Sequence, residues 1–195
     1  MLKKSCWAWA HALPAVPEAA TPADFAARIA GILQELSIAP EVIAQRGLQL
    51  QVEPAELVDV SVSTDGYIFQ LTPAARNAWR AMQAAAVRDG VTMALVSAYR
   101  SVERQREIVT TKLARGDSIA EILTFVAPPG YSEHHTGRAI DIGTSEEDAL
   151  EEVFETTPAF TWLQVHAVEY GFVMSYPRDN AQGFVYEPWH WCYRG

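Results

Sequence analysis

The chain has 195 residues, of which 49% are hydrophobic and 20% are charged, and this composition is typical of one globular domain with room for an extra N-terminal piece. The formal net charge of -9 excludes the basic surface that a nucleic-acid-binding protein presents. No apolar run approaches the roughly 18 residues that a transmembrane helix needs. The two cysteines, Cys6 and Cys192, have no metal-binding spacing and exclude a small scaffold built from disulfides, although one bridge between them stays open.

The N-terminal region has few regular features. Residues 1–20 contain Pro14, Pro17 and many small residues, which predict an irregular arm. The start is basic, as in a signal peptide, but His11 and aromatic residues interrupt the apolar stretch that should follow. This pattern slightly favours a cytoplasmic location over the cell envelope. A first helix is predicted to begin at Thr21-Pro22, where a capping residue precedes a proline.

Helical and strand-like patterns follow without a regular alternation. Apolar residues at helical spacing predict helices over 73–88, 102–115, 118–126, 146–156 and 158–170. Alternating or continuous apolar runs predict strands over 47–53, 60–62, 67–69, 92–97, 139–142, 172–175 and 184–191. Asp65-Gly66 is a hairpin turn signal. The chain is therefore predicted to adopt an α+β fold, with a small, mainly antiparallel sheet flanked by helices.

Two segments carry residues suited to metal chemistry. A catalytic zinc needs three protein ligands, usually His and carboxylate, and an open position for water. His134 and Asp141 flank small residues that let the chain fold back, and His190 can supply a third ligand from a neighbouring strand. Glu187 precedes His190 by three residues. It can approach the same metal without binding it and can act as a base for the metal-bound water.

Each of these residues also has a simpler interpretation. An isolated His is more often a surface or core residue than a ligand, and the tryptophans on either side of His190 can belong to the core. Asp141 is unusual, because strands are depleted in aspartate. Arg100, at a predicted strand end, can grip a carboxylate through two parallel hydrogen bonds or can form an ordinary surface salt bridge.

Taken together, three segments resemble the VanY-type D-alanyl-D-alanine carboxypeptidases, part of a wider zinc peptidase family that includes hedgehog-like domains. Residues 132–141 (SEHHTGRAID) resemble S-x-H-x-x-G-x-A-x-D at all five fixed positions. Residues 187–191 (EPWHW) resemble E-x-W-H-W, and residues 97–101 (SAYRS) resemble the strand end S-x-Y-R-S. The resemblance covers about residues 60–195 and implies a zinc peptidase domain of the hedgehog/D,D-peptidase-like fold there. Residues 1–59 form an N-terminal arm and helix whose role it leaves unknown.

The resemblance also implies roles for the matched residues. Glu187 takes a proton from zinc-bound water and passes it to the leaving amine, and Arg100 binds the substrate carboxylate or stabilises the oxyanion. The implied Zn²⁺ ligands are His134, Asp141 and His190. The residues implied to contact or wall the substrate are Arg100, Gln105, Ser132 and Trp189.

The implied activity is removal of the C-terminal D-alanine from peptidoglycan stem peptides, across a D,D or an L,D bond. One alternative is an endopeptidase of the same family that cuts within the stem. Another is a noncatalytic zinc-containing binding module, although such a module has no need for the base at Glu187. His135 falls at a variable motif position, so it is expected near the ligands or at the surface, and Cys192 is expected to be a packed thiol. The sequence does not predict the oligomeric state.

Overall fold

The computed structural model describes residues 21–63, 66–144 and 149–195. Its first elements are α1 (Pro22–Glu35), α2 (Pro40–Gln45), β1 (Val58–Val62), β2 (Ile68–Leu71), α3 (Pro73–Arg88), β3 (Ala94–Ser97), α4 (Val102–Ala114) and α5 (Ile119–Phe125). There follow the short 3-10 helix η1 (Glu133–Thr136), β4 (Ala139–Gly143), η2 (Glu152–Thr156), α6 (Pro158–His166), η3 (Ala167–Tyr170), β5 (Phe172–Met174) and β6 (His190–Tyr193). The predicted irregular arm with Cys6 and His11, Asp65 of the predicted turn, and residues 146–148 of a predicted helix lie outside the described residues.

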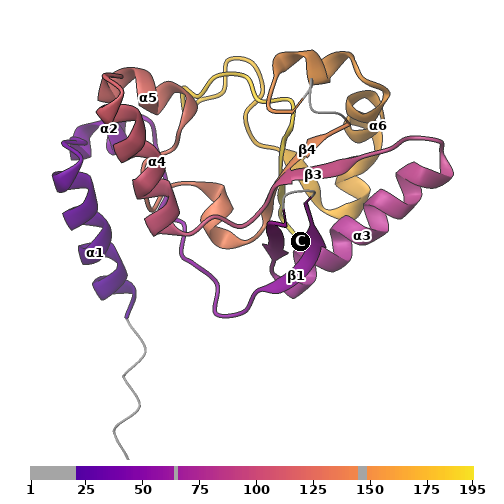
Figure 1. Ribbon diagram of the computed structural model, residues 1–195, viewed down its shortest axis with the longest axis horizontal. Coiled ribbons are helices and arrows are strands. Elements are labelled where there is room, and N and C mark those ends of the chain that lie inside the picture. Colours follow the sequence, from indigo (N-terminus) through magenta and orange to yellow (C-terminus); the bar gives the residue numbers. More distant parts are fainter. Residues whose placement is uncertain (1–20, 64–65, 145–148) are drawn as a thin grey trace, which may run out of the picture.

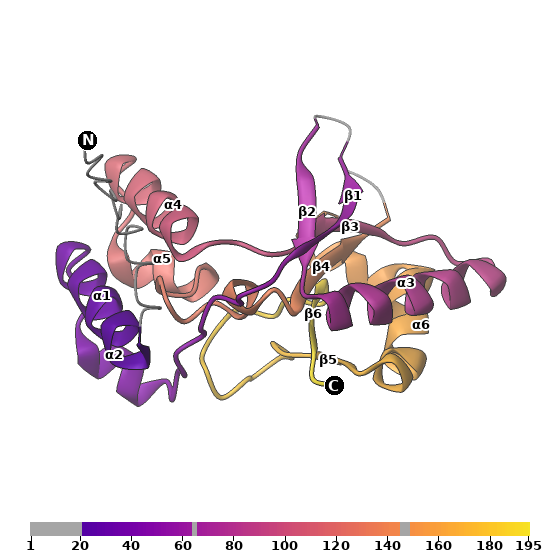
Figure 2. The same cartoon turned by 90° about the horizontal axis from the view of Figure 1, so that it is seen from below.

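Two antiparallel sheets confirm the predicted α+β class. β3, β4, β6 and β5 form a four-stranded sheet in that order, and β1 and β2 form a separate hairpin. Figures 1 and 2 show α3 and α6 on one side of the larger sheet, and α1, α2, α4 and α5 gathered at the other end of the molecule. In Figure 2 the β1–β2 hairpin projects away from the body.

Capping residues begin the helices where the sequence predicts. Thr21 precedes the proline at the start of α1, and its hydroxyl accepts the Asp24 N–H while the Asp24 carboxylate accepts the Thr21 N–H. Thr72 caps α3 in the same position before a proline. Such a cap stabilises a helix by about 1 kcal/mol, because it satisfies N–H groups that have no partner within the helix.

Several of the predicted elements are wrong or too long. The described part of the helix predicted over 146–156 is a turn followed by the 3-10 helix η2, and it contains no α-helix. Residues 47–53 form no strand, because among the described residues a single backbone bond, from the Gln51 N–H to the Gly130 carbonyl, links them to a segment distant in the sequence. The predicted strand over 184–191 reduces to β6, because Asn180 closes a turn on the backbone of Phe184. The predicted helix over 158–170 is α6 followed by the 3-10 turn η3. α2 was not predicted, since Ala39 gives no capping signal before it.

Two hydrophobic clusters fill the interior. One lies between α3, α6 and the four-stranded sheet and includes Trp79, Phe154 and Phe172. The other joins α1 and α2 to α4 and α5, with Ile29 and Val109 buried in it. The first helices therefore share a core with helices that follow residue 100. The division between residues 1–59 and 60–195 stays a prediction. None of the described helices is long and apolar enough to cross a membrane.

The contact between α1 and the loop at Gly130 gives a test of this shared core. Gly130 has φ +88°, and an added Cβ would lie 2.6 Å from a side-chain carbon of the buried Ile29. We expect Gly130→Ala to lower the free energy of unfolding by about 3 kcal/mol, because left-handed strain adds to overpacking. Urea denaturation followed by circular dichroism measures this loss.

Gly90→Ala is the matched control. Its φ is +78°, but among the described residues no heavy atom lies within 4 Å of the added Cβ. The expected loss is about 1 kcal/mol, from strain alone. Equal losses in the two variants would show that the packing of α1 against this loop contributes nothing to stability.

Candidate metal centre and active-site cleft

A cleft of about 550 Å³ opens between the α4–α5 end of the molecule and the four-stranded sheet. Phe125 and Ala127, at and just after the end of α5, line it together with Tyr176 and Tyr186. All eight site residues predicted from the sequence contribute to its wall: Arg100, Gln105, Ser132, His134, Asp141, Glu187, Trp189 and His190. The structure thus brings the three sequence segments together in one cavity.

The predicted ligands form a compact group at the cleft. His134, Asp141 and His190 each offer a donor atom, and these atoms all lie within 4.8 Å of one another. The sheet register creates this arrangement, because Asp141 in β4 pairs with His190 in β6 on one side and with Ser97 in β3 on the other. Neighbouring residues of β4 point to the opposite face, where Ile140 and Ile142 are fully buried in the core.

The surroundings of His134 suit a cation. Its Nδ1 lies 2.6 Å from the Ala98 carbonyl oxygen, which only accepts, so Nδ1 carries the proton. Complete burial lowers the pKa of His134, which keeps the ring neutral. The Nε2 lone pair then faces the Asp141 Oδ2 at 3.2 Å. Two acceptors that face each other this closely repel, and a metal ion between them would turn the repulsion into coordination.

His190 is held on both ring nitrogens. Nδ1 lies 2.9 Å from Asp141 Oδ1, and Nε2 lies 3.0 Å from Glu133 Oε2. Burial favours the neutral ring, but the hydrogen bonds to these two carboxylates raise the pKa of His190 to about 10. Tyr176 stacks on the ring with centroids 4.7 Å apart. Glu133 therefore fixes the ring so that Nδ1 faces the other two donors.

Glu187 lies beside the three donors without joining them. The His190 N–H donates to the Glu187 carbonyl across a tight turn, which places Glu187 Oε2 3.9 Å from His190 Nδ1. Burial raises the pKa of Glu187 to about 7, and the neighbouring Asp141 adds to the rise. A carboxyl group with such a pKa exchanges protons readily near neutral pH, as a general base and acid must.

Arg100 lines the same cleft. Its guanidinium donates to Gln105 Oε1 at 2.9 Å and to Ser97 Oγ at 3.3 Å. Within the described ranges, no carboxylate forms an ion pair with it. The buried Gln105 also donates to the Ala127 carbonyl at 2.7 Å. Gln105 thus holds the Arg100 guanidinium towards the cleft, ready for an anion.

His135 and Cys192 lie outside the group of donors. The His135 Nδ1 donates to the Arg100 carbonyl at 2.6 Å, and its Nε2 accepts the Gly130 N–H at 3.1 Å. Both nitrogens are therefore used, and burial lowers the pKa of the ring to about 4. Cys192 is buried, and burial raises the pKa of its thiol to about 12, so it remains protonated and unsuited to metal binding.

Two residues of the site were not predicted from the sequence. Glu133 occupies a variable motif position, yet its carboxylate holds His190 on one oxygen and Arg194 on the other. Tyr176 has no motif around it and reaches His190 only through the fold. The signal that could have marked Glu133 is its place next to His134, since an acidic residue beside a predicted ligand can support another ligand.

A buried pair of histidines with an aspartate, next to a carboxylate that is free to act as a base, is the donor set of a metallopeptidase. The family model of VanY, D-alanyl-D-alanine carboxypeptidase, matches residues 69–195. The chain therefore belongs to the VanY family of D-alanyl-D-alanine carboxypeptidases.

Individual relatives agree with this family. The chain is 37% identical over 159 residues to YodJ of Bacillus subtilis, whose name assigns it only provisionally as a carboxypeptidase; this match spans 77% of the chain and 58% of YodJ. It is 32% identical over 163 residues to a D-alanyl-D-alanine carboxypeptidase of Enterococcus faecalis, across 78% of the chain and 54% of that protein. The chain thus spans little more than half the length of these relatives.

Solved structures show the same fold. The LdcB LD-carboxypeptidase matches with a TM-score of 0.67 and 36% identity, across 73% of this chain and 70% of its own. A variant of the vancomycin-resistance D,D-pentapeptidase VanY in complex with Zn(II) matches with a TM-score of 0.56 and 28% identity, across 76% of this chain and 87% of its own. VanYB in complex with D-alanine-D-alanine matches with a TM-score of 0.56 and 30% identity, across 75% of this chain and 86% of its own.

The bond between Glu133 and His190 yields a stability prediction. Glu133→Ala leaves the buried His190 and the Arg194 guanidinium without their shared carboxylate. We expect the free energy of unfolding of the metal-free protein at pH 6 to fall by about 3 kcal/mol, the usual cost of breaking a buried pair. At pH 6 the pKa of Glu133, lowered to about 2, and that of His190, raised to about 10, both leave the pair charged.

Glu107→Ala is the control for this prediction. Glu107 pairs with Arg104 at 2.9 Å, but its side chain is 63% exposed, so the expected loss is below about 1 kcal/mol. Urea denaturation compares the two variants with the wild type. A loss no larger for Glu133→Ala than for the control would mean that His190 does not depend on Glu133.

Proposed function

We propose that this protein is a zinc-dependent carboxypeptidase that removes the C-terminal D-alanine from peptidoglycan stem peptides. The observation that carries the proposal is one cleft that holds the group His134, Asp141 and His190 with the carboxyl group of Glu187 beside it. The same cleft holds the guanidinium of Arg100, which forms no ion pair with the described residues. The family match, a relative solved with Zn(II) and another solved with D-alanine-D-alanine support it.

The three donors fit zinc. Two imidazole nitrogens and one carboxylate oxygen are ligands that Zn²⁺ prefers, and three protein ligands leave a position free. Zinc bound by His134, Asp141 and His190 would supply Lewis acidity to the substrate carbonyl and lower the pKa of water. Glu133 and the Ala98 carbonyl would keep the two rings in place through their other nitrogens.

Glu187 is the proposed catalytic base and acid. Its carboxylate oxygen accepts a proton from the attacking water and later donates that proton to the nitrogen of the departing D-alanine. The buried position, with only 13% of the side chain exposed, limits competing exchange with bulk solvent. The pKa of about 7, raised by burial, suits transfer in both directions.

Arg100 is the proposed receptor for the terminal carboxylate of the substrate. A guanidinium can bind a carboxylate through two parallel hydrogen bonds, and Gln105 and Ser97 restrict its orientation. A site for a free carboxylate favours a carboxypeptidase over an endopeptidase, whose substrate continues beyond the cut. Ser132 and Trp189 line the same cleft and are proposed to contact the peptide.

The direct test is incubation of the zinc-loaded protein with a peptidoglycan pentapeptide and with a tetrapeptide, followed by mass spectrometry. We expect loss of one terminal D-alanine, and the peptide that is trimmed assigns a D,D or an L,D bond. Glu187→Gln should lower kcat by about 10²- to 10⁴-fold, because general base catalysis is lost, and a chelator should abolish cleavage.

The control for this assay is Glu107→Gln, which makes the same chemical change at an exposed carboxylate that pairs with Arg104. Its activity should equal that of the wild type. An internal cut would assign an endopeptidase instead. A protein that holds one zinc and cleaves neither peptide would contradict the proposal and favour a binding module.

Zinc binding should release protons. In the metal-free protein the pKa of His190 is raised to about 10, so the ring is protonated at pH 7 and must lose the proton on Nδ1 before this nitrogen can coordinate. We expect the apparent zinc affinity to rise up to about tenfold per unit of pH between pH 6 and 8.

Isothermal titration calorimetry in two buffers of different ionisation enthalpy measures the released protons. Loss of at least about one proton per zinc is expected. Zinc affinity that is independent of pH, with no proton released, would contradict coordination through His190.

A further inference from the structure

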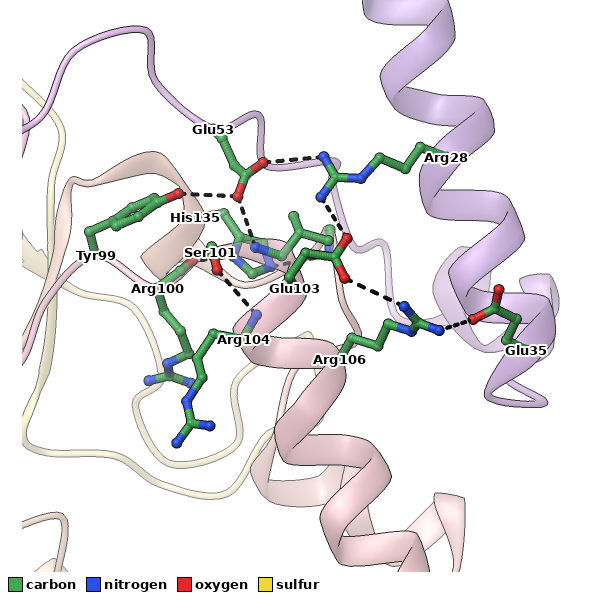
Figure 3. A network of polar contacts seen from close by, with 12 residues as sticks. Arg28, Glu35, Glu53, Tyr99, Arg100, Ser101, Glu103, Arg104, Arg106 and His135 are labelled. Carbon is green, nitrogen blue, oxygen red and sulfur yellow. Dashed lines mark hydrogen bonds and ion pairs between the residues drawn. The ribbon is translucent and has the colours of Figure 1, made fainter.

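Glu53 lies in the extended segment after α2 and ahead of the residues that the family model matches. Figure 3 shows its carboxylate between α1 and the start of α4. Oε1 accepts a hydrogen bond from the Tyr99 hydroxyl at 3.1 Å and another from the Val102 N–H at 2.9 Å. Only 24% of the side chain is exposed. A single oxygen thus joins two residues that are separated by Arg100 and Ser101.

The backbone of Arg100 is held between these two bonds. The Arg100 N–H donates to the His134 carbonyl at 3.2 Å, and its carbonyl accepts from His135 Nδ1 at 2.6 Å. Val102 is the first residue of α4, where N–H groups have no partner within the helix. Glu53 supplies that partner from a distant part of the chain, and a negative charge is favourable at this end of a helix.

We propose that Glu53 is a positioning residue for Arg100. By holding Tyr99 and Val102, its carboxylate sets the direction in which the Arg100 side chain leaves the backbone and enters the cleft. This inference rests on the proposed role of Arg100 as receptor for the substrate carboxylate. It places a determinant of substrate binding in the N-terminal region, whose role the sequence does not reveal.

A role limited to attaching α1 is the competing explanation. Arg28 of α1 lies 3.4 Å from Glu53 but 2.9 Å from Glu103, and Arg106 links Glu103 to Glu35. These exposed pairs, drawn in Figure 3, tie α1 to α4 independently of Glu53. Glu103 is therefore the matched control, because Glu103→Gln weakens the attachment of α1 without touching Tyr99 or Val102.

The test compares two substrates, a stem peptide with a free C-terminal carboxylate and the same peptide with a C-terminal amide. Wild type should prefer the free acid in kcat/KM. Glu53→Ala should reduce this preference by about tenfold or more, chiefly through KM, because a small displacement of a binding group is costly. Glu103→Gln should keep the preference of the wild type. Glu53→Gln retains an acceptor oxygen and should keep part of the preference for the free acid.

A double-mutant cycle separates positioning from general stability. In an Arg100→Ala background, Glu53→Ala should cause no further loss of preference, because both changes remove the same interaction. Binding of D-alanine-D-alanine, measured by calorimetry, gives the same comparison without turnover. Thermal unfolding of each variant confirms that folded protein is compared.

The outcomes distinguish the two proposals. Glu53 does not position Arg100 if Arg100→Ala removes the preference for the free acid and Glu53→Ala leaves it intact. The same conclusion follows if the losses of preference in the two single variants add up in the double variant. An equal fall in kcat/KM for the free acid and the amide in Glu53→Ala would also contradict the positioning role. If Arg100→Ala leaves the preference unchanged, the proposed carboxylate receptor is wrong, and the positioning role of Glu53 falls with it.

Discussion

The buried carboxylate of Asp141 is the constraint on which the site depends. It lies in β4, one of the two inner strands of the four-stranded sheet, with only 3% of the residue exposed. An uncompensated charge at such a depth is strongly unfavourable. The protonated His190 of another strand compensates this charge from 2.9 Å. The neutral His134 faces the other carboxylate oxygen at 3.2 Å, where a bound metal ion would balance the charge. Each ring is then fixed from its far side, by Glu133 or by the Ala98 carbonyl. The geometry of the centre is thus a consequence of charge balance in the core.

The turn that carries His134 and His135 also contacts the strand end that carries Arg100. His134 accepts the Arg100 N–H on its carbonyl and donates from its ring to the Ala98 carbonyl. His135, its neighbour, binds the Arg100 carbonyl. The strand end that presents Arg100 and the turn that presents His134 are therefore joined at three points. A displacement of one would move the other, so the positions of the proposed metal ligand and the proposed carboxylate receptor are set together.

The sequence predicts the fold class and the residues that gather in this cleft, but not every element around them. His134, Asp141, Glu187 and His190 follow short spacings within single turns and strands, and local spacing is visible in a sequence. The contact between Glu133 and His190 spans 57 residues, and the sheet register that creates it has no local signal. The strand predicted over 47–53 failed for a related reason. Apolar and polar residues do alternate there, but no strand of the described part of the chain pairs with it.

The turn from Glu187 to His190 has a consequence for how such enzymes diversify. One bond from the His190 N–H to the Glu187 carbonyl sets the distance between the proposed base and the proposed metal ligand. An insertion or deletion between them would therefore displace both at once. Insertions and deletions are therefore expected outside the turn from Glu187 to His190. Residues 177–186 line the cleft through Phe184, Val185 and Tyr186 and belong to no strand. Evolution can lengthen or remodel that segment to admit new peptides while the chemistry stays unchanged.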